Sequence, residues 1–315
     1  MGKLAFIFPG QGAQAVGMGK DLIEAEPEAR RLYEEADEAL GFSLSTIILE
    51  GPDTELKQTA NTQPALLTTS IAFLERFRAR HDLQPDYVAG HSLGEYSALV
   101  AAGVMSFADA VRTVRARGQF MEAAVPAGQG AMAAVLGAER EVLQKLCEAV
   151  SAEGHAVELA NLNCPGQIVI SGTAAGVQAI VERGKEEAGA KRIMPLEVSG
   201  PFHSSLMRPA SEQLAAVLDQ VHMSSASVPV VANVDARPVT EPERIRTLLV
   251  EQVYSSVLWE DTVAWLIAEG VDTFIEFGSG SVLAGLIKKI DRSVTVHSIN
   301  SLEALEKFQL EPVQP

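Results

Sequence analysis

The stretch Gly90-His91-Ser92-Leu93-Gly94 constrains the fold of this chain more than any other. Residues 87–89 before it read as a short buried strand, and residues 95–102 after it are typical of a helix that ends at Gly103. A strand, a tight glycine-flanked turn and a helix form a nucleophile elbow, which lifts a serine hydroxyl clear of a sheet. The sequence therefore predicts Ser92 as a nucleophile, with an ordinary Gly-Ser turn as the alternative.

Helical and strand-like segments alternate along all 315 residues, which predicts an α/β fold with a mainly parallel sheet. We expect its strands at 4–8, 87–89, 228–232, 271–277 and 294–299. We expect its main helices at 27–40, 61–80 (with Pro64 in the first turn), 95–102, 106–124, 206–222, 259–269 and 282–290. The tail to residue 315 is expected to fray.

Between these halves, the pattern changes to β-α-β-β-α-β, the order of a ferredoxin-like unit. Its strands are expected at 131–136, 156–162, 167–171 and 192–198, and its helices at 139–152 and 174–188. We therefore predict a discontinuous catalytic core over 1–127 and 199–315. The insert over 128–198 is expected to act as a lid or substrate clamp.

Charge and composition narrow the range of partners. The chain carries 25 basic and 41 acidic side chains, a net charge of −16, which argues against nucleic acid and anionic membranes as partners. No apolar stretch is long enough to span a bilayer. The two cysteines, Cys147 and Cys164, lack metal-type spacing and are expected to be buried thiols in a reducing compartment. We expect a cytoplasmic protein with no metal and no cofactor.

The loop after the first strand carries a glycine pattern that imitates another function. Gly10-x-Gly12-x-x-Ala15 matches a loose dinucleotide-binding fingerprint, which also requires a helix directly after it. The helix expected at 27–40 starts too late, so nucleotide binding is disfavoured. We expect the loop to supply backbone donors beside a reaction centre, with Gln11 facing it.

A serine nucleophile needs a base, and the chain offers six histidines. His203 is favoured because it lies in the loop where the chain returns from the insert to the core. His91 adjoins Ser92, but adjacent residues on such a turn point apart. The pattern of the residues alone identifies neither an acidic partner for His203 nor which of the nearby arginines has a role.

Four motifs in order resemble those of the malonyl-CoA:acyl carrier protein transacylases of bacterial type II fatty acid synthesis. They are the stretches 8–14 (FPGQGAQ), 90–98 (GHSLGEYSA), 161–167 (NLNCPGQ) and 201–204 (PFHS). The resemblance covers about residues 3 to 300. It implies an α/β-hydrolase-like core and transfer of malonyl from malonyl-CoA to acyl carrier protein by a ping-pong mechanism.

The resemblance also implies roles for individual residues. Ser92 corresponds to the nucleophile and His203 to its base. The backbone N–H groups of Gln11 and Leu93 correspond to the oxyanion donors, and the backbone carbonyl of Gln252 to the group that orients the base. The implied catalytic pair is a Ser-His dyad with a neutral orienting residue.

The substrate-binding residues follow from the same resemblance. Arg117 corresponds to the arginine that pairs with the malonyl carboxylate, and His91 and Asn163 correspond to pocket residues. Phe202 corresponds to a position where Phe accompanies malonyl and Ser accompanies methylmalonyl in related domains. Ser256 and Ser279 depart from the family pattern, which usually has proline at both positions.

Because acyl carrier proteins of this family are acidic, a local basic patch is expected to dock them. The candidates are Lys288, Lys289, Arg292, Lys191 and Arg192. We expect a monomer whose partners are malonyl-CoA, coenzyme A and acyl carrier protein. The alternatives are a trans-acting polyketide acyltransferase, a serine esterase and a non-catalytic carrier-protein binder.

Overall fold

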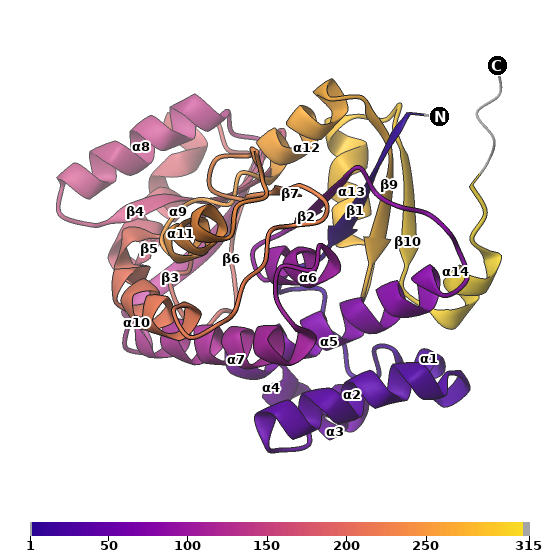
Figure 1. Ribbon diagram of the computed structural model, residues 1–315. Coiled ribbons are helices and arrows are strands. Elements are labelled where there is room, and N and C mark those ends of the chain that lie inside the picture. Colours follow the sequence, from indigo (N-terminus) through magenta and orange to yellow (C-terminus); the bar gives the residue numbers. More distant parts are fainter. Residues whose placement is uncertain (1, 311–315) are drawn as a thin grey trace.

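The computed structural model describes residues 2–310 and contains two separate β-sheets (Figure 1). The larger sheet has six strands, in the spatial order β10 (Thr295–Ile299), β9 (Val271–Phe277), β1 (Lys3–Phe8), β2 (Tyr87–Gly90), β7 (Val230–Val231) and β8 (Pro238–Val239). Every pair in it is parallel except the β7–β8 pair. The mixed α/β architecture with a mainly parallel sheet is therefore confirmed.

Strand β1 is buried on both faces, as its unbroken apolar sequence predicts. Leu4, Phe6 and Phe8 join one hydrophobic cluster, while Ala5 and Ile7 join another on the opposite face. The alternation follows from the two-residue period of a strand. The sheet is therefore covered by helices on both sides.

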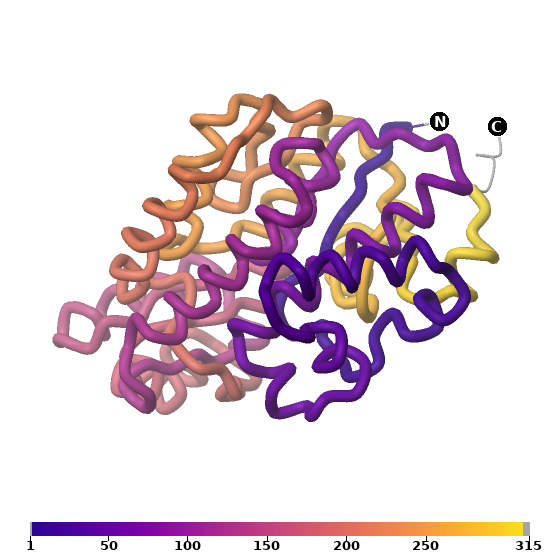
Figure 2. Tube along the Cα trace, turned by 60° about the horizontal axis from the view of Figure 1, so that its bottom comes forward, coloured from indigo at the N-terminus to yellow at the C-terminus, as the bar shows by residue number. Residues whose placement is uncertain are grey.

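On one side lie α5 (Thr59–Arg78), α6 (Gly94–Ala101) and α7 (Phe107–Ala123), and on the other α12 (Trp259–Ala268) and α13 (Val282–Ile290). The N-terminal helices gather against α5, outside the sheet layers (Figures 1 and 2). They are α1 (Lys20–Ala25), α2 (Pro27–Leu40), α3 (Leu44–Glu50) and α4 (Asp53–Leu56). No helix within residues 2–310 is both long and apolar enough to cross a membrane.

The smaller sheet is antiparallel and has its own hydrophobic cluster. Its strands lie in the spatial order β4 (Val157–Cys164), β5 (Gln167–Thr173), β3 (Gly130–Leu136) and β6 (Arg192–Pro195). Two helices, α8 (Arg140–Ala152) and α9 (Ala174–Glu187), pack on it. The chain order of these elements is β-α-β-β-α-β.

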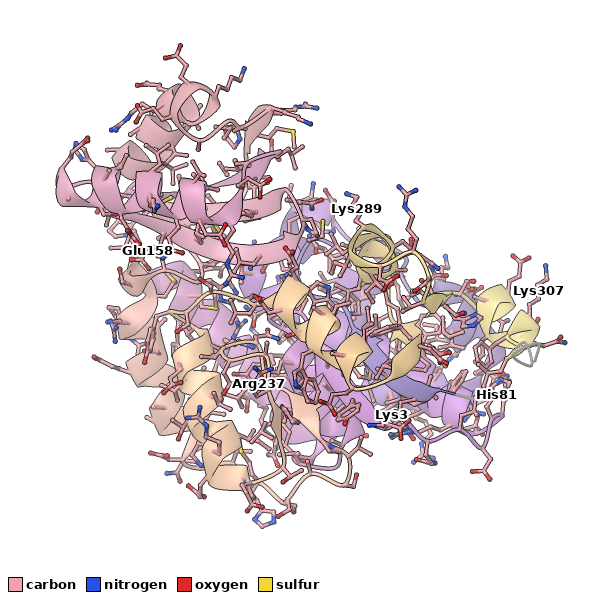
Figure 3. The ribbon with its side chains drawn as sticks, turned by 90° about the horizontal axis from the view of Figure 1, so that it is seen from above. Lys3, His81, Glu158, Arg237, Lys289 and Lys307 are labelled. Carbon is pink, nitrogen blue, oxygen red and sulfur yellow. The ribbon has the colours of Figure 1, made fainter. Side chains whose placement is uncertain are left out.

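Polar contacts join the smaller sheet to the rest of the molecule. Glu158 on β4 accepts hydrogen bonds from the backbone N–H (3.1 Å) and the hydroxyl of Ser205. Lys289 on α13 donates from Nζ to Oε1 of Gln167, at 3.0 Å. Figure 3 shows Glu158 and Lys289 along this boundary. The loop that carries His203 is thus tied to the smaller sheet two residues after the histidine.

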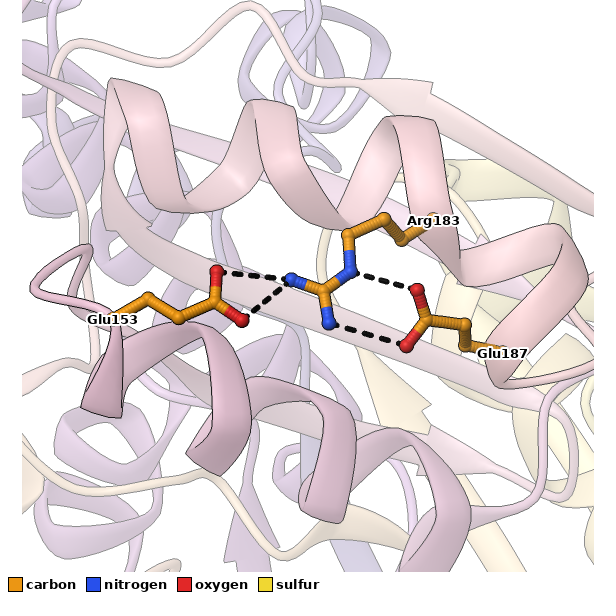
Figure 4. A network of polar contacts seen from close by, with 3 residues as sticks. All are labelled: Glu153, Arg183 and Glu187. Atoms are coloured by element: carbon orange, nitrogen blue, oxygen red, sulfur yellow. Dashed lines mark hydrogen bonds and ion pairs between the residues drawn. The ribbon is translucent and has the colours of Figure 1, made fainter.

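On the outer surface of the smaller sheet, one arginine binds two carboxylates (Figure 4). Arg183 on α9 donates from Nη1 to both carboxylate oxygens of Glu153, at 2.9 and 3.0 Å. Its Nε and Nη2 donate to the two oxygens of Glu187, at 2.8 and 3.1 Å. These contacts connect α9 to the residue that follows α8.

Several predicted boundaries are wrong because tertiary packing overrides local signals. The helix predicted to open at residues 61–64, with Pro64 in its first turn, begins at Thr59, so Pro64 lies inside it. Its first turn is stable because residues 59–63 are all buried. The tail predicted to fray contains α14 (Leu302–Lys307), after which Phe308 packs against the rings of Phe77 and His81, 4.9 and 5.1 Å away. Residues 311–315 lie outside the described part of the chain.

Other elements are shorter than predicted or were missed. The helix predicted at 206–222 is divided into a 3₁₀ turn (Ser205–Met207) and α10 (Arg208–Leu218), which has proline in its first turn. The strand predicted at 192–198 ends at Pro195, and the strand predicted at 228–232 reduces to β7. Helix α11 (Pro242–Gln252) and strand β8 (Pro238–Val239) were not predicted, although Ile245, Leu248 and Leu249 have the i, i+3, i+4 spacing of a helix. Cys147 and Cys164 are both buried free thiols.

Candidate active site

The Gly90–Gly94 turn joins β2 to α6 at the carboxyl end of the parallel sheet. Ser92 adopts a left-handed conformation, with φ of 50°, which is sterically costly for a residue with a side chain. Gly90 is required because a Cβ there would lie 2.0 Å from the backbone of Gly94. The turn therefore has the strained geometry of a nucleophile elbow, with Ser92 at its apex.

The loop after β1 lies against this turn. Phe8 pairs with Gly90 in the parallel register, so both chains leave the sheet at the same edge. A Cβ at Gly10 would lie 2.3 Å from the carbonyl oxygen of His91. The close approach of the two backbones, rather than a dinucleotide, accounts for this glycine.

His203 contacts the serine directly. Its Nε2 lies 2.7 Å from Ser92 Oγ, and its Nδ1 lies 2.9 Å from the backbone carbonyl oxygen of Gln252. Since a carbonyl only accepts, Nδ1 carries the hydrogen and Nε2 is free to accept the serine proton. Burial, assisted by the positive charge of Arg117, lowers the pKa of His203 to about 3. The imidazole is therefore neutral at pH 7 and suited to act as a base.

Arg117 on α7 lies in the same site with 1% of its surface exposed. Its Nη2 donates to Ser92 Oγ (3.1 Å) and to Gln252 Oε1 (2.9 Å), and its Nη1 donates to Gln63 Oε1 (2.8 Å). Among the described residues, no carboxylate lies within 4.0 Å of the guanidinium. Burial lowers the pKa of Arg117, but an arginine remains a cation at neutral pH. A buried positive charge beside the nucleophile is thus left with neutral partners only.

Two backbone donors near Ser92 are unused. Within residues 2–310, the N–H groups of Gln11 and Leu93 have no hydrogen-bond acceptor in the protein. The N–H of Ser92 itself is occupied, because it donates to Oδ1 of Asn233 at 2.7 Å. The side chain of Gln11 is also occupied, donating to the hydroxyl of Thr59 at 3.2 Å. Free N–H groups at such a turn can receive the negative oxygen of a tetrahedral intermediate.

A cavity of about 110 Å³ opens at this group of residues. Its lining comes from both parts of the molecule: Gln11, Gln63, His91, Ser92, Leu93, Arg117, Met121, Phe202 and His203 from the larger part, and Met132, Asn161, Leu196 and Val198 from the segment that follows residue 128. The volume suits an acyl group of a few atoms rather than a long chain. The site is therefore small, and Arg117 supplies a positive charge in its wall.

Asn163 is the one predicted pocket residue that does not border this cavity. Its Oδ1 lies 2.8 Å from Nε2 of His91, which does border it, and Asn161 lines the wall instead. The two asparagines are separated by two positions on β4. Burial lowers the pKa of His91, so this imidazole is neutral as well.

Sequence reasoning missed Gln63, Glu95 and Asn233. Glu95 Oε2 accepts from the backbone N–H of Asn233 (3.0 Å) and from Gln252 Nε2 (2.8 Å), and burial raises the pKa of Glu95 to about 7. Asn233 could have been found, because a polar residue just past the carboxyl end of a parallel strand is a usual site residue. Gln63 carried no such signal.

The predicted basic patch is partly engaged within the protein. Lys289 binds Gln167, as described above, and Lys288 Nζ donates to the carbonyl oxygen of Val294. Neither hydrogen-bond partner is a carboxylate. These lysines lie on the last turn of α13.

Comparison with known proteins agrees with this geometry. A family model described as "Acyl transferase domain" matches residues 5–309. A malonyl CoA-acyl carrier protein transacylase of Bacillus subtilis (strain 168) is 58% identical over 306 residues, covering 97% of this chain and 96% of the relative. A relative of the same name from Staphylococcus aureus (strain MW2) is 49% identical over 303 residues, covering 96% and 97%.

Solved structures lead to the same family. An acyl carrier protein S-malonyltransferase from Vibrio cholerae superposes with a TM-score of 0.94 at 44% identity, covering 96% of this chain and 99% of that one. A malonyl-transacylase solved with its type II PKS acyl-carrier protein gives a TM-score of 0.94 at 41% identity, covering 96% and 98%. The chain belongs to the acyl transferase domain family, among the malonyl CoA-acyl carrier protein transacylases.

Proposed function

We propose that this acyltransferase moves the malonyl group of malonyl-CoA to the phosphopantetheine thiol of acyl carrier protein, through a malonyl ester on Ser92. One observation carries the proposal: Ser92 Oγ lies 2.7 Å from a neutral His203 and 3.1 Å from a buried Arg117 that contacts no carboxylate of the described residues. A base, a nucleophile and an unpaired cation within one cavity suit an acyl donor that carries its own carboxylate.

In the first half-reaction, His203 Nε2 takes the proton of Ser92 as Oγ attacks the thioester carbonyl of malonyl-CoA. The carbon–sulfur bond then breaks, and coenzyme A leaves as a thiol with the proton that His203 returns. In the second half-reaction, His203 takes the proton of the carrier thiol, whose sulfur attacks the malonyl ester. Ser92 leaves with that proton, so the enzyme returns to its first state.

The backbone N–H groups of Gln11 and Leu93 are proposed to hold the negative oxygen in both tetrahedral intermediates. Each such donor contributes about 3 to 4 kcal/mol of transition-state stabilisation in enzymes of this kind. The carbonyl of Gln252 keeps the His203 tautomer that this mechanism requires. Phe202 and the partly buried His91 complete the pocket around the acyl group.

Arg117 is proposed to bind the free carboxylate of the malonyl group. Its planar guanidinium can donate two parallel hydrogen bonds to a carboxylate, which is a strong and directional contact. An acetyl group would leave this buried charge without the anion, so acetyl-CoA is expected to be a poor substrate. Phe202 on the cavity wall is expected to exclude the extra methyl of methylmalonyl.

For the architecture, we propose an α/β-hydrolase-like core over 1–127 and 199–315 with a ferredoxin-like insert over 128–198. The strand order and antiparallel pairing of the smaller sheet support the insert. The insert contributes Met132, Asn161, Leu196 and Val198 to the cavity, which supports a role in shielding the ester from water.

The enzyme is proposed to act as a monomer on acyl carrier protein, with the lysines of α13 as part of the docking patch. A malonyl-transacylase of the same fold is complexed with a type II PKS acyl-carrier protein, so a polyketide carrier is the second candidate acceptor. Reversing the charge at Lys288 and Lys289 is expected to raise the KM for the carrier protein and leave the KM for malonyl-CoA unchanged.

The test is the intact mass of the protein after brief mixing with malonyl-CoA. Wild type is expected to gain one malonyl group and Ser92→Ala none. Acetyl-CoA and methylmalonyl-CoA, in parallel samples, are expected to leave little or no adduct. Addition of holo acyl carrier protein should then remove the malonyl group from the enzyme.

Two outcomes would contradict the proposal. Hydrolysis of simple esters without a malonyl adduct would identify a serine esterase. Tight binding of acyl carrier protein with neither adduct nor hydrolysis would identify a non-catalytic carrier-protein binder.

A further inference from the structure

Glu95 is a buried carboxyl beneath the elbow that the proposed reaction does not use. It lies in the first turn of α6, three residues after Ser92, and only 2% of its surface is exposed. Burying an ionisable group is costly unless its hydrogen bonds are satisfied. Its Oε2 accepts two of them, from Asn233 N–H at 3.0 Å and Gln252 Nε2 at 2.8 Å.

The side-chain amide of Gln252 connects this carboxyl to Arg117. The Oε1 atom of Gln252 accepts a hydrogen bond from Arg117 Nη2 at 2.9 Å, while its Nε2 donates to Glu95. The opposite amide orientation would set donor against donor at Arg117 and acceptor against acceptor at Glu95. Glu95 and Arg117 therefore lie on opposite sides of one oriented amide, without direct contact.

We propose that Glu95 is a positioning residue that tunes the acyl specificity of the site, by orienting Gln252 and by acting as the distant counter-charge of Arg117. The inference rests on the proposed function, since it assumes that Arg117 binds the acyl carboxylate. A carboxylate in direct contact with Arg117 would compete with the substrate for the same guanidinium N–H groups. Through one amide, Glu95 balances the buried cation and leaves those groups available.

This arrangement predicts that removing the charge of Glu95 changes the malonyl-over-acetyl preference in the direction opposite to damage of the site. Without the charge of Glu95, the attraction of Arg117 for the substrate carboxylate is no longer offset by repulsion from a second negative charge nearby. Glu95→Gln keeps the shape of the side chain and an oxygen that can accept both hydrogen bonds. It is therefore expected to increase the preference for malonyl over acetyl, whereas disruption of the site would decrease it.

The experiment measures binding without the reaction. In a Ser92→Ala background at pH 8, where Glu95 carries its charge, calorimetry gives the Kd of malonyl-CoA and of acetyl-CoA. Adding Glu95→Gln is expected to raise the ratio of the acetyl-CoA Kd to the malonyl-CoA Kd about tenfold. No change in the ratio, or a decrease, would overturn the proposal.

The larger sheet offers a matched control for Glu95. Glu276 on β9 is also buried, with 1% of its surface exposed, and it binds the N–H groups of Leu283 and Ala284 instead of Gln252. Glu276→Gln in the same background should leave the ratio unchanged. Equal changes in both variants would mean that any buried carboxylate has this effect, which would overturn the specific role of Glu95.

A second measurement keeps the proposal testable if Glu95→Gln does not fold. Burial raises the pKa of Glu95 to about 7, so lowering the pH of the Ser92→Ala protein from 8 to 6 neutralises this carboxyl without a further substitution. The ratio of the acetyl-CoA Kd to the malonyl-CoA Kd is expected to rise, and an unchanged or lower ratio at pH 6 would contradict the inference. If the Ser92→Ala protein itself shows no preference for malonyl-CoA, the proposed function fails instead.

Discussion

Two arginines of this molecule have opposite environments. Arg183, on the surface of the smaller sheet, binds both carboxylate oxygens of Glu153 and both of Glu187 (Figure 4). Arg117, in the cavity, is almost fully buried; within residues 2–310 it donates hydrogen bonds only to Gln63, Gln252 and Ser92, and its guanidinium lies 5.6 Å from the ring of Tyr96. The exposed cation has two anionic partners, and the buried cation has none in direct contact.

Stability alone would favour the reverse arrangement, because water screens a surface charge and cannot reach a buried one. A buried positive charge that contacts only neutral groups is therefore best explained by an anionic ligand that pairs with it when bound. The same comparison separates the two parts of the molecule. The smaller sheet is held by ordinary apolar packing and surface ion pairs. The edge of the larger sheet instead carries strained backbone at Ser92 and His203 and, at Arg117, a buried charge without direct contact to a carboxylate among the described residues.

The largest expected effect comes from removing the buried cation. Arg117→Met should reduce kcat/KM for malonyl-CoA by roughly 10² to 10⁴, since the loss of one partner of a buried charged contact costs about 3 to 5 kcal/mol. The rate with acetyl-CoA should change much less. Steady-state rates with both donors test this, and equal losses for both would mean that Arg117 acts mainly through the structure.

A smaller effect is expected at the wall of the cavity. Phe202→Ser should improve the rate with methylmalonyl-CoA relative to malonyl-CoA by about 10- to 100-fold, because one excluded methyl group corresponds to roughly 1 to 3 kcal/mol. Competition between the two donors, followed by mass spectrometry of the acyl-enzyme, measures the ratio. An unchanged ratio would show that another residue excludes the methyl group.

The buried cation should also shift the pH dependence of Ser92. Arg117 contributes to the lowered pKa of His203, so Arg117→Met should raise that pKa toward the ordinary histidine value of 6.5. In wild type, the rate at which a fluorophosphonate reacts with Ser92 should persist well below pH 6.5, and in the variant the acid limb should move to higher pH. Coincident profiles would show that burial alone lowers the pKa.

The same shift has a consequence for stability. A histidine whose pKa is lowered on folding contributes stability that is present above the unfolded pKa of about 6.5 and lost as the pH falls toward about 3. Wild type should therefore lose stability on acidification over this range. The Arg117→Met variant should lose less free energy of unfolding over this pH range than wild type, because its His203 pKa is lowered less.

The smallest effect is expected at the exposed arginine. Arg183→Ala should lower the free energy of unfolding only slightly, as is usual for surface ion pairs, and leave malonyl transfer unchanged. Denaturant unfolding in low and high salt measures it, and the loss should shrink in high salt. A loss of several kcal/mol would mean that surface ion pairs are central to the stability of the smaller sheet.

Local patterns predicted much of the fold. The apolar run of β1 and the glycine-flanked Ser92 turn contain most of the information for the parallel sheet edge, because strand burial and turn sterics depend on residues close in sequence. The β-α-β-β-α-β order of the smaller sheet was readable for the same reason. The start of α5 and the packing of Phe308 were not, since both depend on burial against distant segments.

By itself, the sequence determined that Ser92 is the candidate nucleophile and, through its motifs, which family the chain resembles. Only the tertiary structure decided what surrounds that nucleophile. Ser92, Arg117 and Gln252 are far apart in the chain and meet because β2, α7 and the end of α11 converge at one edge of the sheet. Whether a charge is buried, and which groups balance it, depends on that convergence and therefore cannot be read from any local pattern.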